Sequence, residues 1–298
     1  MVFYTSLLVG PRALNMTCET LPIWRPDESS PSLATDCSKD LAARKIYEEV
    51  SNSVVQVNIG SIVRRGSASG FLVGDDDEVL TNSHVAAQAG KEWLHITTVD
   101  NKEYTAIIEA ADEANDLALL KVLGLPSGTY KPLPFRPSAS VQPGEEMFVL
   151  GHPGGRAEVY ISPGQMLKRG PLRSLLLDQP DHGAFDAPPN LLNVDKRTQA
   201  RYSPRIGSSA IAQGGNSGGP VVDSHGFAIG VLANVPPPPV SSRSLFVPSE
   251  LAMSLMNPGN RTRRFEYQVE MSLLARPNDA LPRQLSLIGD PLWNIGDP

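Results

Sequence analysis

The chain has few cysteines and no long hydrophobic run. Only Cys18 and Cys37 occur among its 298 residues, so at most one disulfide can form within the chain, and two free thiols fit the sequence equally well. No segment approaches the roughly 18 consecutive apolar residues that a membrane-spanning helix needs. A short apolar run lies near the start, but no basic residue precedes it and no cleavage site is evident. We expect a soluble protein without a membrane span, and the sequence leaves its compartment open.

Basic residues are not in excess either. The chain carries 26 Lys and Arg against 32 Asp and Glu, a formal net charge of −6. It therefore lacks the surplus of positive charge that neutralises phosphates or anionic lipids. We expect no nucleic-acid partner.

Metal-ligand spacing is also missing. The acidic run at 75–78, DDDE, lacks the spaced oxygen ligands and the glycine of a calcium loop, and a solvated hairpin turn accounts for it. His152, His182 and His225 show no metal-ligand spacing. The sequence predicts no metal and no other cofactor.

Glycine and proline, by contrast, are abundant, with 25 and 27 residues, and hydrophobic residues make up 41% of the chain. That hydrophobic content is enough for a sizeable core. Short segments typical of strands, such as SVVQVNIG and EWLHITTVD, are bounded by Gly, Asp or Asn. One series covers about 50–130 and a second about 140–250, joined by a Pro/Ser/Gly-rich connection. The pattern predicts an all-β protein of two small β-barrels packed together.

The ends of the chain lack this pattern. Residues 1–42 are rich in Pro, Ser, Thr and Asp and are predicted to form an extended or poorly ordered leader. The folded domain is predicted at 43–258, with a short helix from about Asp40 and a closing helix at PSELAMSLM. A C-terminal tail follows at 259–298. Residues 171–207 are predicted to be a long loop with little regular structure, which in a compact domain is usually functional or mobile.

The stretch QGGNSGGP contains the candidate nucleophile, Ser217. A serine hydroxyl is a poor nucleophile unless a base removes its proton and a third group holds that base in its productive tautomer. His84, in LTNSHVA, ends a predicted strand, and Asp116, in ANDLALLKV, stands at the mouth of another. A satisfied turn residue is the simpler explanation of either one alone. Together, the order His84, Asp116, Ser217 is that of a chymotrypsin-type triad.

The glycines before the serine fit the same chemistry. A backbone without side chains at Gly214 and Gly215 can turn its N–H groups inward. The N–H groups of Gly215 and Ser217 would then form an oxyanion hole, in which each donor is typically worth on the order of 100- to 1000-fold in rate.

Five segments resemble, in order, the signature blocks of trypsin-like serine proteases of the HtrA/Deg type: TNSHVA, NDLALLKV, VLGHPGG, GGNSGGPVVDSHGFAIGV and LFVPS. The similarity covers roughly 43–256. It implies two packed six-stranded antiparallel β-barrels with short flanking helices, and a serine endopeptidase acting on proteins or peptides. It also implies Ser217 as nucleophile, His84 as general base, Asp116 as the orienting carboxylate, and Gly215 and Ser217 as oxyanion donors.

The same resemblance locates the floor of the specificity pocket at Ala210, Ile211 and Ala212. No Asp stands there to bind a Lys or Arg side chain, and the polar residues that recognise glutamate in glutamyl endopeptidases are absent. We therefore expect a preference for small or medium aliphatic P1 residues.

The sequence departs from the HtrA/Deg pattern in two respects. Only about 40 residues follow the protease region, too few for the PDZ domain that commonly follows there. The stretch between Asp116 and Ser217 is also longer, chiefly because of 171–207. Regulation and oligomeric state therefore stay open.

Two other functions are compatible with parts of the sequence. The segment around Ser217 satisfies G-x-S-x-G, the nucleophile elbow of α/β-hydrolases, but the acid and histidine that follow, Asp223 and His225, are too close to come from separate strand ends. A non-catalytic or chaperone-like peptide-binding module on a protease fold is the second alternative.

Overall fold

The computed structural model describes most of the predicted protease region. The described residues are 21–24, 32–33, 40–59, 66–74, 77–88, 94–176, 200, 202–235 and 243–260. Both cysteines, His182, most of the predicted leader and nearly all of the predicted tail lie outside them.

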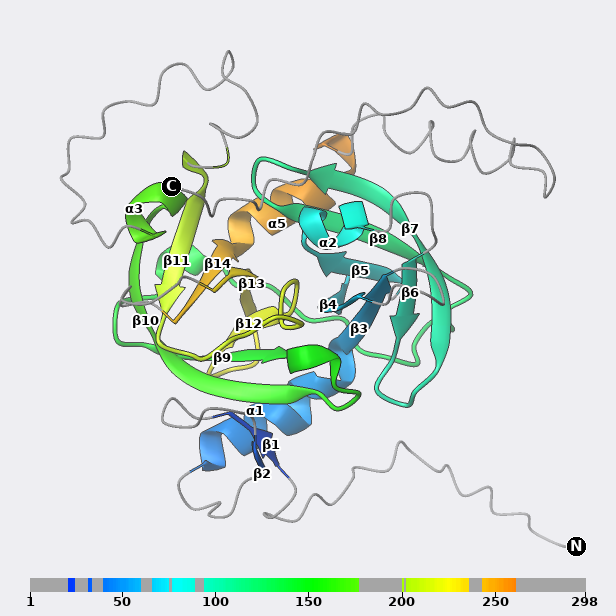
Figure 1. Cartoon of the computed structure of the whole chain (residues 1–298), viewed down its shortest axis with the longest axis horizontal. Helices are drawn as coiled ribbons and strands as arrows, with labels where there is room; N and C mark the ends of the chain where they lie inside the picture. Colours follow the sequence, from blue (N-terminus) through cyan, green and yellow to red (C-terminus); the bar gives the residue numbers. More distant parts are fainter. Residues whose placement is uncertain are drawn as a thin grey trace, which may run out of the picture.

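The first barrel is a closed antiparallel sheet in the order β3-β4-β5-β8-β7-β6 (Figure 1). Successive side chains of a strand point to opposite faces of the sheet, so every second residue can face the barrel core. Val55 and Val57 of β3 lie in this core together with Leu120 of β8. The strands are β3 (Val54–Ile59), β4 (Gly66–Val73), β5 (Glu78–Thr81), β6 (Leu94–Thr97), β7 (Glu103–Asp112) and β8 (Leu117–Leu123).

The second barrel is built from the other strand series. The ladder runs β9-β10-β11-β14-β13-β12, and β12 pairs back with β9 to close it. Its core includes Val149, Val221 and Phe246. The strands are β9 (Glu146–Gly151), β10 (Tyr160–Pro171), β11 (Pro204–Ser208), β12 (Pro220–Asp223), β13 (Ala228–Asn234) and β14 (Ser244–Pro248). Two six-stranded antiparallel barrels confirm the predicted fold class.

Short helices flank the barrels. They are α1 (Leu41–Val50), α2 (Ser83–Gln88), α3 (Leu172–Leu176) and α5 (Ser249–Met256). Helix α1 buries Ala43, Ile46, Tyr47 and Val50, one face of a 3.6-residue period. Helix α5 packs against β7 and β8 of the first barrel and against β13 and β14 of the second, so it helps to hold the two together. No described helix has both the length and the apolar character that a membrane crossing requires.

Part of the predicted leader is packed into the core. Strand β1 (Pro22–Ile23) pairs in parallel with β10 through Ile23 and Ile161, and antiparallel with β2 (Ser32–Leu33). Leu21, Ile23 and Trp24 are buried. This stretch belongs to the folded domain, because Leu21 and Ile23 pack in the same buried cluster as Ile161 of β10.

The predicted loop at 171–207 needs a correction at both of its ends. Strand β10 continues to Pro171 and runs directly into α3, and β11 already begins at Pro204. Regular structure forms there because Leu172 and Leu175 pack with Leu245 of β14 in a small apolar cluster. Residues 177–199 lie outside the described part of the chain.

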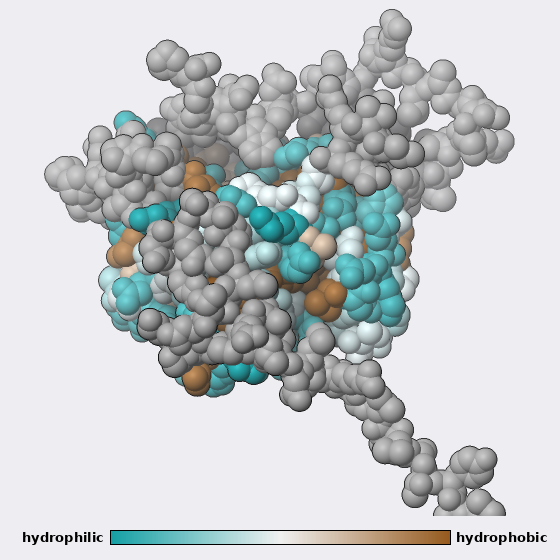
Figure 2. Space-filling view, turned by 60° about the horizontal axis from the view of Figure 1, so that its bottom comes forward, coloured by the Kyte–Doolittle hydropathy of each residue, from teal (hydrophilic) through white to brown (hydrophobic). Residues whose placement is uncertain are grey.

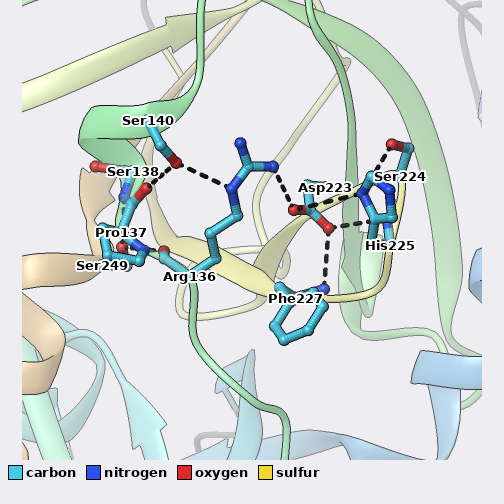
Figure 3. A network of polar contacts seen from close by, with 9 residues as sticks. All are labelled: Arg136, Pro137, Ser138, Ser140, Asp223, Ser224, His225, Phe227 and Ser249. Atoms are coloured by element: carbon cyan, nitrogen blue, oxygen red, sulfur yellow. Dashed lines mark hydrogen bonds and ion pairs between the residues drawn. The ribbon is translucent and has the colours of Figure 1, made fainter.

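The connection between the barrels is tied to the second barrel by polar contacts (Figure 3). Arg136 Nη1 donates to Asp223 Oδ2 at 2.9 Å, and its Nε donates to Ser140 Oγ at 2.9 Å. Asp223 Oδ1 accepts from the backbone N–H groups of His225 and Phe227 at 2.9 and 3.1 Å. Asp223 and His225, the residues of the α/β-hydrolase alternative, thus lie at the end of β12 and in the turn that follows it, where the aspartate bonds to this turn and to Arg136.

The surface in the view of Figure 2 shows hydrophobic residues singly or in small groups among hydrophilic ones. The exposed large hydrophobic residues of the described chain come from separate elements and are Leu41, Val99, Leu123, Phe227 and Val235. A scatter of this kind is ordinary for a globular protein.

Glu250, in the first turn of α5, supports the inter-barrel connection. Its carboxylate accepts from Ser138 Oγ at 2.6 Å and from Ala139 N at 2.8 Å. Partial burial opposes ionisation, but these hydrogen bonds outweigh it and lower the pKa of Glu250 below its ordinary value. A lowered carboxyl pKa stabilises the fold above the ordinary glutamate pKa, and this stabilisation is lost as the pH falls through the lowered pKa.

We therefore predict that Glu250→Gln lowers the free energy of unfolding at pH 7 by about 1 kcal/mol, a modest value because the carboxylate is still partly exposed to solvent. Urea unfolding between pH 7 and pH 3 should show the difference from the wild type shrinking below about pH 4. Glu146→Gln, at the exposed start of β9, is the matched control and should leave stability unchanged. A pH-independent difference for Glu250→Gln would contradict this account.

Candidate active site

His84 and Asp116 form a close pair on the first barrel. His84 lies in α2, directly after β5, and Asp116 lies in the turn before β8. The His84 Nδ1 atom is 2.8 Å from Asp116 Oδ2 and 2.9 Å from Oδ1. Because an ionised carboxylate only accepts hydrogen bonds, Nδ1 carries the proton and the neutral imidazole keeps its basic lone pair on Nε2. The pair can therefore supply a base at Nε2.

The carboxylate of Asp116 is also fixed from the start of α2. Its Oδ1 atom accepts from the backbone N–H of His84 and from Ser83 Oγ, each at 3.1 Å. The side chains of His84 and Asp116 are only 14% and 17% exposed. These contacts hold the carboxylate in one orientation against the ring.

The backbone at Asp116 is unusual. Its φ is 62°, in the left-handed region that residues with a side chain rarely adopt. The buried side chain of Asn82 donates from Nδ2 to the Asp116 carbonyl at 2.9 Å and holds the turn. Sequence reasoning missed Asn82, although it lies two residues before His84 at the end of a buried strand, where a polar side chain needs a partner.

Ser217 lies in the loop between β11 and β12, on the second barrel. The Gly214 carbonyl of this loop accepts from Gly154 N at 2.7 Å. Because C=O and N–H of a trans peptide point in opposite directions, the Gly215 N–H is directed away from Gly154. Among the described residues, neither the Gly215 nor the Ser217 N–H donates to a protein acceptor. Two backbone donors next to the serine hydroxyl are thus available for an oxyanion.

At two positions of this loop, any residue larger than glycine would be both strained and in steric clash. Gly215 has φ 98°, and a Cβ there would collide with His152 O and come within 2.8 Å of Gly154 N. Gly218 has φ 85°, and a Cβ there would collide with Ser69 O and Thr81 Oγ1. Conformation and space both demand glycine on each side of Ser217.

Ser69, on β4 of the first barrel, joins the two halves of the site. Its backbone N–H donates to the Ser217 carbonyl at 2.9 Å, and its Oγ donates to the Gly215 carbonyl at 2.7 Å. Its Oγ accepts from His152 N at 2.9 Å, and its carbonyl accepts from Thr81 Oγ1 at 2.8 Å. Thr81 ends the strand that leads to His84. Sequence reasoning did not single out Ser69, because its burial and its partners appear only in the folded structure.

The predicted pocket residues lie just before the serine loop and are mostly buried. Ala210 and Ala212 belong to the apolar core of the second barrel, and Ile211 is 9% exposed. The Ile211 N–H donates to Ser162 Oγ at 2.9 Å, and β10 approaches so closely that a Cβ on Gly164 would collide with the backbone of Ala210. The segment is therefore held rigidly against β10.

His152, near the serine loop, is a poor candidate for the base. Burial lowers its pKa to about 4, and its Nδ1 atom lies 3.0 Å from the Arg156 carbonyl. The ring is neutral at physiological pH. No group of three or more His, Cys, Asp or Glu among the described residues could hold a metal ion.

Comparison with known proteins shows to which family the chain belongs. Residues 68–231, more than half of the chain, match a family model described as "Trypsin-like peptidase domain". The chain belongs to this family. Among curated relatives of this trypsin-like chain, Protease Do-like 1, chloroplastic, of Arabidopsis thaliana is 26% identical over 203 residues, covering 64% of this chain and 41% of that protein. Serine protease HTRA2, mitochondrial, of Bos taurus is 29% identical over 196 residues, covering 62% and 37%.

The trypsin-like chain thus spans less than half the length of these curated relatives. Two solved structures share its fold. The HtrA-type protease AlgW with tripeptide has a TM-score of 0.55 and 21% identity, covering 73% of this chain and 63% of that chain. Deg5 has a TM-score of 0.54 and 22% identity, covering 72% and 92%. The resemblance to the HtrA/Deg type is confirmed.

The loop geometry predicts that alanine is destabilising at Gly215 and tolerated at the neighbouring Gly214. Gly215→Ala should lower the free energy of unfolding by about 2–4 kcal/mol, because it adds backbone strain and a steric clash. Gly214→Ala is the control, since a Cβ at that position meets nothing within 4 Å. Urea unfolding of both variants checks this. Equal stabilities would show that the loop can relax around a side chain at Gly215.

Proposed function

We propose that this protein is a serine endopeptidase in which Ser217 is the nucleophile, His84 the general base and acid, and Asp116 the residue that orients His84. The observation that carries the proposal is the His84–Asp116 pair on one barrel, connected through Ser69 to the Ser217 loop on the other, in a chain of the trypsin-like family. The relatives include proteins named as serine proteases, which supports the same reaction.

The proposed reaction has two halves. His84 Nε2 accepts the proton of Ser217 as Oγ attacks the substrate carbonyl carbon, and the resulting oxyanion accepts hydrogen bonds from Gly215 N–H and Ser217 N–H. The imidazolium then gives the proton to the leaving amine, and an acyl-enzyme remains. Water activated by His84 hydrolyses that ester and restores Ser217. Asp116 stays ionised throughout and stabilises the imidazolium.

The substrates we propose are proteins or peptides with a small or medium aliphatic P1 residue. Ala210, Ile211 and Ala212 are apolar and packed against β10, so they offer no charge to a basic or acidic side chain. A rigid apolar wall selects by size and discriminates by only about 1–3 kcal/mol per methylene. The proposal needs no metal or other cofactor, because the serine, imidazole and backbone donors complete the reaction.

The reaction is tested by labelling with a fluorophosphonate probe, which reacts with an activated serine. Wild type should be labelled, Ser217→Ala should not, and His84→Ala should be labelled on the order of 10²- to 10⁴-fold more slowly because it lacks the general base. Circular dichroism of each variant controls for folding. Labelling of Ser217→Ala would contradict the assignment of Ser217 as the nucleophile. A folded wild type that is not labelled would favour a non-catalytic peptide-binding module.

The specificity is tested by profiling a peptide library with wild type. Cleavage after Val, Ala, Ile or Leu should exceed cleavage after Arg or Glu by at least about tenfold in kcat/KM, because a desolvated charge would find no partner in the pocket. Strong cleavage after Arg or Glu would refute the proposed pocket.

A further inference from the structure

Arg205, on β11, is the largest side chain that is completely buried in the described chain. Its Nη1 atom donates to Ser203 Oγ and to the Pro204 carbonyl at 3.0 Å, and its Nη2 atom donates to the Asn115 carbonyl at 3.2 Å. Within the described part of the chain it makes no direct ion pair. A buried cation held only by neutral acceptors is unfavourable for stability, so its position calls for another explanation.

The oxygen held by Nη2 belongs to the peptide that joins Asn115 to Asp116. Asn115 is held from both sides. Its backbone N–H and Nδ2 donate to the two carboxylate oxygens of Asp112 at 3.0 and 2.7 Å, and its Oδ1 accepts from Ser203 Oγ at 2.7 Å. Asp112 ends β7 on the first barrel, whereas Ser203 and Arg205 come from the second. The second barrel therefore holds the peptide whose N–H belongs to Asp116.

The charge of Arg205 matters as well as its hydrogen bonds. Burial lowers its pKa to about 10, while the electrostatic attraction of Asp116 and Asp112 acts in the opposite direction. The guanidinium therefore stays protonated at neutral pH. Its positive charge is attracted by both carboxylates, which places a buried cation beside the turn that contains Asp116.

We propose that Arg205 is a positioning residue for Asp116: from the second barrel it holds the Asn115–Asp116 peptide in its left-handed turn and keeps the carboxylate against His84. The assignment rests on the proposed function of His84 and Asp116. Arg205 acts through Asn115 and Asp116, so its loss should lower kcat and leave substrate binding nearly unchanged.

Three variants test this role. Arg205→Met removes the donors and the charge and should lower kcat about 10- to 100-fold, with KM changed less than about threefold. Arg205→Lys keeps the charge but not the fork of donors, and should recover part of the loss. Ser203→Ala removes one contact to Asn115 and should lower kcat about 3- to 10-fold. Combined with Arg205→Met, its effect should be less than additive, because both act through Asn115.

Arg136→Met is the matched control. It removes an arginine of the connection between the barrels that is paired with the buried Asp223, in a network that contains neither His84 nor Ser217 (Figure 3). It should lower the melting temperature and leave kcat and KM unchanged.

A second readout does not depend on activity. The low-field proton resonance of the His84 Nδ1–H, assigned by its absence in His84→Ala, reports the hydrogen bond to Asp116. This resonance should shift or disappear in Arg205→Met and stay in Arg136→Met. If wild type hydrolyses no substrate, the proposed function fails, and the resonance still decides the role of Arg205.

The outcomes separate cleanly. If Arg205→Met folds, a kcat within about twofold of wild type or an unchanged His84 resonance overturns the proposal. A loss of kcat no larger than that of Arg136→Met overturns it as well. If Arg205→Met does not fold, the test falls to Arg205→Lys and Ser203→Ala. The proposal is overturned if both of these variants keep the wild-type kcat and an unchanged His84 resonance. A kcat loss in both of these supports it.

Discussion

The contact that Ser69 makes between the two barrels is the constraint on which the candidate site depends. Its N–H, carbonyl and hydroxyl are all used, by Ser217 and Gly215 in the serine loop, by His152, and by Thr81 in the strand that leads to His84. Each of these groups is buried, and leaving one without a partner costs about 1–3 kcal/mol. A shift of one barrel against the other would therefore cost free energy, because it would break these hydrogen bonds. The same contact fixes the conformation of the serine loop.

Left-handed backbone conformations also occur at the candidate site. Asp116, Gly215 and Gly218 all have positive φ values, which glycine adopts readily. At Asp116, which carries a side chain, such a conformation persists only where the surrounding structure over-determines it, here through the hydrogen bond from Asn82. The regular strands of the barrels supply that surrounding structure, and the candidate catalytic residues lie outside these strands.

Apolar packing supports the polar junction. One continuous buried cluster contains Phe71 of the first barrel, Phe148 of the second, Ile46 of α1 and Ile23 of the N-terminal strand. The ring centroids of Phe71 and Phe135 lie 6.1 Å apart, so the connecting segment takes part as well. Docking of the barrels therefore draws on the N-terminal residues, the connection and α5, all of which lie outside the twelve barrel strands.

Short-range patterns in the sequence determined the strands, because alternation and turn residues are local properties. The order of His84, Asp116 and Ser217 along the chain, with glycines around the serine, indicated the chemistry for the same reason. Patterns of this kind could not reveal the burial of residues 21–24 or the continuation of β10 to Pro171, since both depend on partners far away in sequence.

The amino-acid sequence by itself thus determined the two-barrel class and the residue types at the site. Only the tertiary structure decided that Asn82 and Ser69 hold the turn of Asp116 and the loop of Ser217, and that Arg205 reaches Asn115 from the opposite barrel. The physical reason is that a buried polar group acquires its role from its partner, and these partners are brought together only when the barrels dock.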